Sequence, residues 1–463
     1  MMTFIRARVG TRLHLVPDIP TGLTCYHIKK FLKILKYLII SISILIVLAL
    51  IVIFARPMWR YAVTYPRFDK SVRELAKLRK EPPKISKYNI YRGALHMHTY
   101  WSHDSEGTLY DIIPAAKKNQ IDFIFLSDHP HKGLDTFPRG YKGLYDGVLI
   151  EPGSEQGGFD AWPLKDAVIN WRGNIDTIAK TIIRDGGMMF YAHPEEPHNW
   201  DSPYYQGMEI YNIHTDILDE PSYLPFLINA VINMKKYRPW VIREIFDEQV
   251  DILARWDSLN THRKVTGFSA VDSHENVNIR AKMLSDGRIQ WYGPNAKPID
   301  TARVTVWNRW LLTEPDENGW VCKMMFDTYD SNFNYVSNFV FSDSLTVTSL
   351  SKHLIKGNHF TAFTDLGDAR GFCYYAKDVD GAVIGIMGDS LKISHTASLH
   401  AVSPFPGQFR LMHNGRLVHN SSEDDYAFEW KKPVQKGAYR LEVHLKIRGK
   451  YIPWVYTNPI YFE

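Results

Sequence analysis

The longest hydrophobic run of the chain lies near its N-terminus. Residues 37–55 read YLIISISILIVLALIVIFA, which is 19 residues without a charge. This length is close to the roughly 20 residues that a helix needs to cross a hydrocarbon layer of about 30 Å. A cleaved signal peptide usually has an apolar region of only about 7–15 residues. The pattern therefore predicts one uncleaved transmembrane helix over 37–55.

Basic residues flank this run on both sides. We expect residues 1–36 to form a basic tail, and residues 56–87, with a charged run and Pro82-Pro83, to form a short helix and a stiff tether. The tighter basic cluster lies upstream, at Lys29, Lys30, Lys33 and Lys36. Because Lys and Arg accumulate on the cytoplasmic side, we expect a single-pass protein whose body lies on the extracytoplasmic (periplasmic) side.

From Tyr88 onward, short apolar runs alternate with helical stretches. The runs NIYRGALHMH, IDFIFLSDH, GMMFYAHP and VTGFSAVDSH are strand-like and end in polar residues, whereas TLYDIIPAAKKN and NIDTIAKTIIRDG have helical spacing. A repeated order of strand, polar end and helix is typical of an α/β barrel or a doubly wound sheet. Such folds carry their site at the carboxyl ends of the strands, so residues 88–363 predict an α/β domain with a site there.

The helical signal fades after about residue 364. Asn414-Gly415 stands between two strand-like runs, and both positions tolerate the positive φ of a tight hairpin turn. The run YRLEVHLKI alternates strictly, with Leu441 and Val443 on one face and Arg440 on the other, which predicts a half-buried antiparallel strand. We expect residues 364–463 to form a β-sandwich.

Charge and cysteine content narrow the possible functions. The net charge of +5 conceals an N-terminal excess: residues 1–80 hold 15 basic and 3 acidic residues (+12), which leaves 40 basic and 47 acidic residues (−7) in the rest. An acidic body argues against a nucleic-acid partner. The three cysteines, Cys25, Cys322 and Cys373, form no CxxC pair. Any bound metal must therefore be held by His and carboxylates.

Suitable metal ligands recur where strands are expected to end. His96 and His98 are two residues apart, so that in an extended strand they face the same way. Further candidates follow other apolar runs: His129, Glu155, His193, Glu209, Asp272 and His274. Imidazole with carboxylate suits zinc, manganese or iron, and a shared carboxylate can bridge two ions. The pattern predicts a multinuclear hydrolytic centre.

The ordered motifs HMH, SDH, GSE, AHP and DSH resemble those of the PHP metallohydrolases, a family named for domains of DNA polymerases and histidinol phosphatase. The resemblance spans residues 88–363. It implies a distorted TIM-like barrel of about seven strand–helix units, (βα)7, with two or three divalent ions. The HTYWSHDSEGT loop, the SKHLIKGNHFTAF stretch and the ending PWVYTNPIYF look most like the branch that contains carbaryl-hydrolase-like enzymes.

The resemblance also implies a role for each ligand position. One ion would be held by His96, His98, Glu155 and Asp272. Glu155 would bridge to a second ion that also takes His193. His129 and His274 would hold a third ion together with His103 or Asp104, of which we favour Asp104. The family's further His between the bridging Glu and AHP is absent from residues 156–192, so we expect the second ion to be weakly held or absent.

The expected activity is metal-dependent hydrolysis of a small-molecule phosphate ester by metal-activated water. Asp272 and His274 are the expected catalytic residues, with His274 or the third ion assisting protonation of the leaving group. Two alternatives stay open. The closer branch suggests hydrolysis of a carboxyl or carbamate ester, and a different class of protein would be an envelope binding or sensing protein with a non-catalytic barrel. Nothing in the sequence indicates a protein partner.

Overall fold

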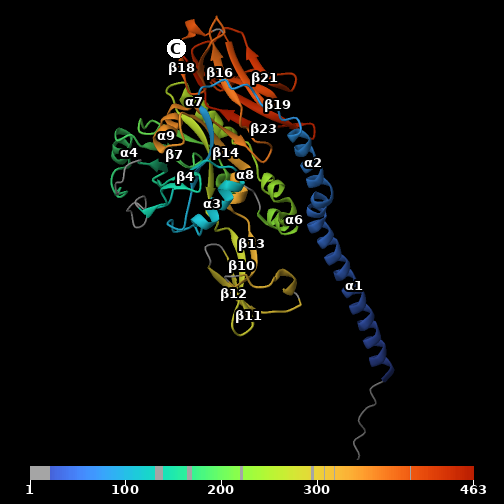
Figure 1. Ribbon diagram of the computed structural model, residues 1–463. Coiled ribbons are helices and arrows are strands. Elements are labelled where there is room, and N and C mark those ends of the chain that lie inside the picture. Colours follow the sequence, from blue (N-terminus) through green and yellow to red (C-terminus); the bar gives the residue numbers. More distant parts are fainter. Residues whose placement is uncertain are drawn as a thin grey trace, which may run out of the picture. The chain divides into compact units, whose positions relative to one another are not determined.

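The computed structural model (Figure 1) describes residues 21–463 except 131–138, 164–168, 219–222, 294–296, 307, 317–318 and 397. The chain divides into two compact units, Met1–Trp59 and Arg60–Glu463. Most of the predicted basic tail, residues 1–20, lies outside the described residues.

The first unit is the helix α1 (Thr21–Trp59). It contains the whole apolar run 37–55, and every side chain of that run is exposed. In length and composition this helix is able to cross a membrane, and an N-terminal signal sequence has the same properties. The apolar helix is thus confirmed, whereas the side of the membrane on which the body lies stays a prediction.

The second unit begins with a short π-helix (Arg60–Thr64) and α2 (Tyr65–Ala76), in the region where a short helix is predicted. Helix α2 packs on α6 (Tyr223–Arg243). Beyond α2 the chain is held against the body, because the Lys80 N–H donates to the carbonyl oxygen of Pro404 (2.9 Å). The segment that follows the apolar helix is therefore part of the folded body.

A mixed α/β sheet forms the centre of the second unit, as predicted. Parallel strands pair in the order β4 (Val148–Glu151), β2 (Phe123–Phe125), β1 (Asn89–Met97), β9 (Thr266–Ser273), β8 (Gly207–Asn212) and β7 (Met188–Tyr191). The strands β3 (Gly143–Tyr145), β5 (Ser154–Gln156) and β6 (Phe159–Trp162) add antiparallel pairs. Closure of this sheet into a seven-unit barrel stays a prediction.

Helices follow several of these strands: α3 (Leu109–Lys118), α4 (Ile175–Arg184), α5 (Ile213–Leu218), α7 (Val250–Asn260), α8 (Tyr329–Tyr335) and α9 (Val347–Lys356). Local sequence sets their ends. The Asn174 side chain accepts from the Thr177 N–H at the start of α4, which satisfies a donor that the helix itself leaves unpaired. Helix α9 ends at Gly357, which has the left-handed conformation (φ 81°) that glycine adopts without strain.

A small antiparallel sheet interrupts the α/β pattern between β9 and α8 (Figure 1). It consists of β10 (Asn278–Met283), β11 (Arg288–Tyr292), β12 (Pro298–Arg303) and β13 (Trp320–Met325), in the order β12–β11–β10–β13. The sequence analysis did not predict this insertion. Among the described residues, its own core consists of Ala281, Ile289, Val321 and Cys322.

The C-terminal part is largely antiparallel. Its strands are β16 (Cys373–Lys377), β17 (Val383–Ile386), β18 (Ser390–Leu391), β19 (Ser398–His413), β20 (Arg416–Asn420), β21 (Asp425–Trp430), β22 (Gly437–Ile447), β23 (Lys450–Thr457) and β24 (Ile460–Phe462). The predicted hairpin is confirmed, with positive φ at Asn414 (48°) and Gly415 (77°) between β19 and β20. Strand β14 (Val336–Ser342) pairs with β1 and β15 (His359–Phe363), and β15 pairs with β23. A boundary between two domains at residue 364 stays a prediction.

Strand β22 is antiparallel, as predicted, but the prediction that one of its faces meets solvent is wrong. Arg440, Glu442 and His444, on the face expected to meet solvent, are all buried. The Arg440 guanidinium donates two hydrogen bonds to the Asp257 carboxylate of α7 (2.6 and 2.8 Å) and one to Glu442 Oε1 (2.5 Å). Because the charges neutralise one another within this network, both faces of the strand can be covered.

A buried histidine of β15 leads to a prediction about pH. His359 is fully buried, and its Nε2–H donates to the carbonyl oxygen of Gly267 (2.9 Å). Burial lowers its pKa from 6.5 to about 4. The unfolded chain therefore binds this proton at a higher pH than the folded chain, so the stabilisation is complete above pH 6.5 and is lost as the pH falls toward 4. Between pH 7 and pH 5 the loss should be about 2 kcal/mol.

Denaturant unfolding at the two pH values measures this loss. The His359→Gln protein should lack this part of the pH dependence, since its amide can donate to Gly267 without titrating. An identical pH dependence in both proteins would contradict the assignment.

Candidate metal centre

The candidate centre begins at the end of β1. His96 and His98 are both buried, and their Nε2 atoms lie 3.1 Å apart. The sequence analysis expected them to face the same way through simple alternation in an extended strand. That reason is wrong, because His96 has a left-handed backbone (φ 55°) and the pairing of β1 with β9 shifts register between Leu95 and Met97. A local irregularity of β1 accompanies the convergence of the two imidazoles.

A first group of side chains surrounds the two imidazoles at the end of β1. Its members are His96, His98, Glu155 and Asp272, the set expected to hold the first ion. The Nε2 atom of each histidine lies 3.1–3.3 Å from Glu155 Oε2 and 3.4 Å from Asp272 Oδ1. Ligands bound tetrahedrally at about 2.0–2.1 Å are about 3.3 Å from one another. The spacing of His96, His98 and Glu155 thus fits one transition-metal ion, whereas Asp272 forms a group with His96 and His193.

The second oxygen of each carboxylate faces another histidine. His193, which follows β7, places Nε2 3.3 Å from Glu155 Oε1 and 3.6 Å from Asp272 Oδ2. His214, at the start of α5, places Nδ1 3.2 Å from Asp272 Oδ2. Glu155 and Asp272 are therefore each divided between two sets of imidazoles, which is the arrangement that a bridging carboxylate requires.

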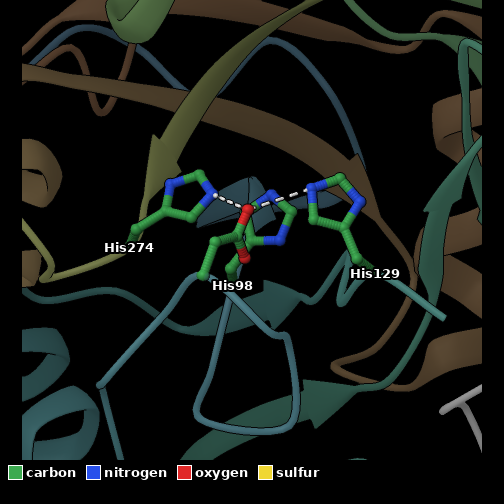
Figure 2. A group of neighbouring side chains, drawn as sticks. His98, His129 and His274 are labelled. Carbon is green, nitrogen blue, oxygen red and sulfur yellow. Dashed lines mark ion pairs between the residues drawn. The ribbon is translucent and has the colours of Figure 1, made fainter. Parts of the chain in front are cut away.

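A third group surrounds Asp104. Its Oδ2 lies 3.3 Å from His129 Nε2 and 3.5 Å from His274 Nε2, and Figure 2 shows these two imidazoles on either side of His98. His98 also stacks on His274, with ring centroids 4.0 Å apart. His103 is exposed and lies outside the groups of potential ligands found among the described residues. Ser102 Oγ donates to Asp104 Oδ1 (2.7 Å) and so helps to orient Asp104 rather than His103.

Five of the six histidines around the carboxylates turn Nε2 toward them and have a partner at Nδ1, whereas His214 turns Nδ1 toward Asp272. The Nδ1 partners are Glu209 Oε1 for His96 (2.5 Å), Ser102 Oγ for His98 (3.4 Å), the carbonyl oxygen of Glu155 for His129 (3.1 Å), Glu195 Oε1 for His193 (3.3 Å) and the carbonyl oxygen of Asp272 for His274 (3.0 Å). Metal-binding histidines typically donate their second N–H in this way, which fixes the tautomer. The shared orientation leaves the Nε2 lone pairs available to an ion.

Two further observations favour a bound cation. Asp272 Oδ1 is buried and accepts no hydrogen bond among the described residues, although a buried charged oxygen without a partner is costly. In addition, His96, His193 and Asp272 have positive φ values of 55°, 48° and 42°. Such backbone strain in residues other than glycine concentrates at functional sites. Imidazole and carboxylate donors of this kind fit zinc, manganese or iron.

The charges of the centre shift several pKa values. Burial disfavours a charged His96, but nearby carboxylates, led by Asp160 and Asp272, outweigh burial and raise its pKa well above the usual value. Burial would raise the pKa of Glu155, yet His96 and His193 lower it well below the usual range. Burial together with His274 lowers the pKa of His98. The Glu155 carboxylate is thus held ionised, as a metal ligand must be.

The sequence analysis assigned no role to two residues that the structure brings to the centre. Asp160 of β6 is buried and places Oδ2 3.3 Å from His96 Nδ1. A signal for His214 was present, because it follows the apolar run GMEIYN just as the other candidate ligands follow theirs. No comparable motif singles out Asp160.

Glu209, at first a candidate ligand, orients other groups. Its Oε1 accepts from His96 Nδ1, and its Oε2 accepts from the His193 N–H (2.9 Å) and from Asn212 Nδ2 (3.0 Å). Replacement of Glu209 by glutamine should therefore weaken metal binding about 10- to 100-fold, since one of its two accepting oxygens becomes an N–H₂ group that cannot accept these hydrogen bonds. Titration against a competing chelator measures the affinity. The surface variant Glu423→Gln should bind metal as the natural chain does, and equal affinities in all three proteins would contradict this role.

Few known proteins resemble this chain. No family model and no curated protein matches the chain. A solved structure from Bacteroides vulgatus, described as a two-domain protein containing a predicted PHP-like metal-dependent phosphoesterase, is similar at 14% identity and a TM-score of 0.30. The match covers 82% of this chain and 99% of the other. A TM-score of this size does not establish a common fold, so the ligand groups rest on the geometry of this chain alone.

Proposed function

We propose that the chain is a membrane-anchored, metal-dependent hydrolase that cleaves small-molecule phosphate esters at a centre of two or three ions. The observation that carries this proposal is the division of Glu155 and Asp272 between separate histidine groups. Carboxylates that face two ligand sets can hold neighbouring cations. Helix α1, which is long and apolar enough to span a bilayer, is the proposed anchor.

The residues present determine how such a centre would work. Divalent ions bound there would lower the pKa of water from 15.7 toward about 7 and neutralise charge on a phosphoryl group. A hydrogen bond orients the Asp272 carboxylate, because Asn212 Nδ2 donates to its Oδ2 (3.2 Å). His274 Nε2 lies beside Asp104 on the less buried side of the cluster. At a centre of two ions, in which His274 holds no metal, we assign to His274 the delivery of a proton to the departing alcohol.

An assay of the purified full chain in detergent tests the proposal. Elemental analysis should find at least two ions per chain, and an aryl phosphate should be hydrolysed in a reaction that a chelator stops and zinc, manganese or iron restores. Aryl acetates and aryl carbamates are tested in parallel. Turnover of these esters alone would favour the carboxyl or carbamate ester hydrolase, and a metal content well below one ion per chain would favour a binding or sensing protein.

The role of His274 is tested separately with the His274→Asn protein. It should lose turnover while it retains most of the bound metal. The exposed His262→Asn protein is the control and should keep both. Unchanged turnover of His274→Asn would contradict the assigned proton transfer.

A further inference from the structure

Helix α6 exposes an apolar stripe and buries its amide side chains. Leu224, Leu227 and Val231 are 64%, 39% and 52% exposed. Spacings of three and four residues place them along one face of the helix. Asn229 and Asn233 are instead fully buried on the side that faces the body. The inward side also buries apolar residues such as Ala230 and Met234, so α6 is apolar on both its buried and its exposed side, whereas a surface helix in water normally keeps its outer face polar.

The buried amides are held by specific partners, which fix the orientation of the helix. Asn229 Nδ2 donates to the Tyr65 hydroxyl (2.7 Å), and Asn233 Nδ2 donates to Asn229 Oδ1 (2.9 Å). Phe68 and Trp240 pack beside them, with ring centroids 4.7 Å apart. Rotation of α6 to bury its apolar stripe would break these hydrogen bonds. The outward stripe is therefore a stable feature of the fold.

Positive charge gathers where the stripe ends. Lys235 and Lys236 are exposed and directly follow it along the helix. They line a cavity of about 540 Å³ together with Lys118 and Arg238. The only acidic residue in its described lining is Asp330, which pairs with Lys118 (2.7 Å). An apolar stripe followed by a basic cavity suits a partner that offers both acyl chains and phosphate groups.

The same part of the body is joined to the chain that leaves the apolar helix. Arg60 pairs with Glu244 just beyond α6. The Tyr61 ring lies 5.6 Å from the Tyr237 ring, and Lys236 Nζ lies 4.9 Å from the Tyr61 centroid. Tyr61 follows the last apolar residue, Ala55, by only six positions, which span at most about 20 Å even when fully extended. A membrane crossed by residues 37–55 would thus lie within reach of α6.

We propose that the exposed face of α6 is a membrane-docking surface. Leu224, Leu227 and Val231 enter the boundary between head groups and acyl chains, and the basic cavity at Lys235 and Lys236 binds the phosphate of an anionic lipid. This inference rests on the proposed membrane anchoring. Docking holds the body close to the bilayer, where basic residues near an anionic surface strengthen the attachment.

Site-specific quenching in lipid nanodiscs tests the proposal on the full chain. In a Cys25→Ser background, in which Cys322 and Cys373 are buried, Val231→Cys carries a thiol-reactive fluorophore. Val379→Cys is the control: Val379 is 82% exposed on the turn between β16 and β17, and Figure 1 shows β16 well apart from α6. Nitroxide-labelled lipid should quench the Val231 probe several-fold more than the Val379 probe, and aqueous iodide should do the reverse.

Lipid composition tests the basic cavity. Nitroxide quenching at Val231 should be stronger with phosphatidylglycerol than with phosphatidylcholine alone, and Lys235→Glu with Lys236→Glu should remove that difference. Quenching of the Val231 probe by iodide alone would show a face in water and overturn the proposal. Shielding from both quenchers, which would indicate a second copy or a protein partner, would also overturn it. Phosphate-ester turnover in the same samples reports the proposed activity independently, so loss of one does not imply loss of the other.

Discussion

Replacement of Asp272 by asparagine should lower metal-dependent turnover by about 10³-fold, because it removes the charge from a carboxylate shared between two histidine groups. The amide keeps the size of the side chain, and the buried Oδ1 accepts no hydrogen bond among the described residues, so folding should be preserved. Elemental analysis should show fewer ions per chain, in parallel with the loss of activity. Steady-state assays with saturating added metal measure the remaining turnover.

The control for Asp272→Asn is Asp286→Asn, the same change at an exposed position beside Arg288. That protein should retain its metal and its turnover. If Asp272→Asn binds the full complement of ions and hydrolyses substrate at the natural rate, the candidate centre is not the place of catalysis.

Replacement of Arg440 by methionine should destabilise the fold by about 3–5 kcal/mol, because the Asp257 carboxylate then stays buried without its partner. The lost stability comes mainly from the buried Asp257 charge that is left unpaired, and less from the missing attraction to Arg440. Glu442 is affected less, since Arg410 Nη1 also lies 2.9 Å from its Oε2. Denaturant unfolding of the full chain in detergent measures the change.

A second substitution separates the unpaired charge from lost packing. In the protein with both Arg440→Met and Asp257→Leu, no unpaired Asp257 carboxylate remains, so much of the stability should return. A double variant as unstable as Arg440→Met alone would show that packing of the guanidinium, rather than charge, accounts for the loss.

The sequence predicted those parts of the fold that depend on local pattern. The hairpin at Asn414-Gly415 follows from the conformational freedom of two adjacent residues, and α2 follows from a short helical run. The burial of β22 on both faces could not be read in this way. It depends on Asp257, which lies 183 residues before Arg440 in the chain and reaches it only in the folded protein.

For the candidate centre, ordered motifs after apolar runs were the most informative signal. All the predicted ligands except His103 are brought together, although their role as ligands stays a prediction. The choice between His103 and Asp104 required the structure, because the two side chains are adjacent and only one turns inward. Asp160 was missed because it contacts the Nδ1 side of the His96 imidazole, and no sequence motif connects these two positions.

The inserted sheet β10–β13 leaves and rejoins the chain beside His274. Asp327, just after β13, accepts from the backbone N–H groups of His274 (2.9 Å) and Glu275 (2.8 Å) and from Ser273 Oγ (3.0 Å). The Asp327 carboxylate therefore links the two ends of the inserted sheet. As a result, we expect changes in length at the outer hairpin β11–β12 to leave the backbone of His274 in place.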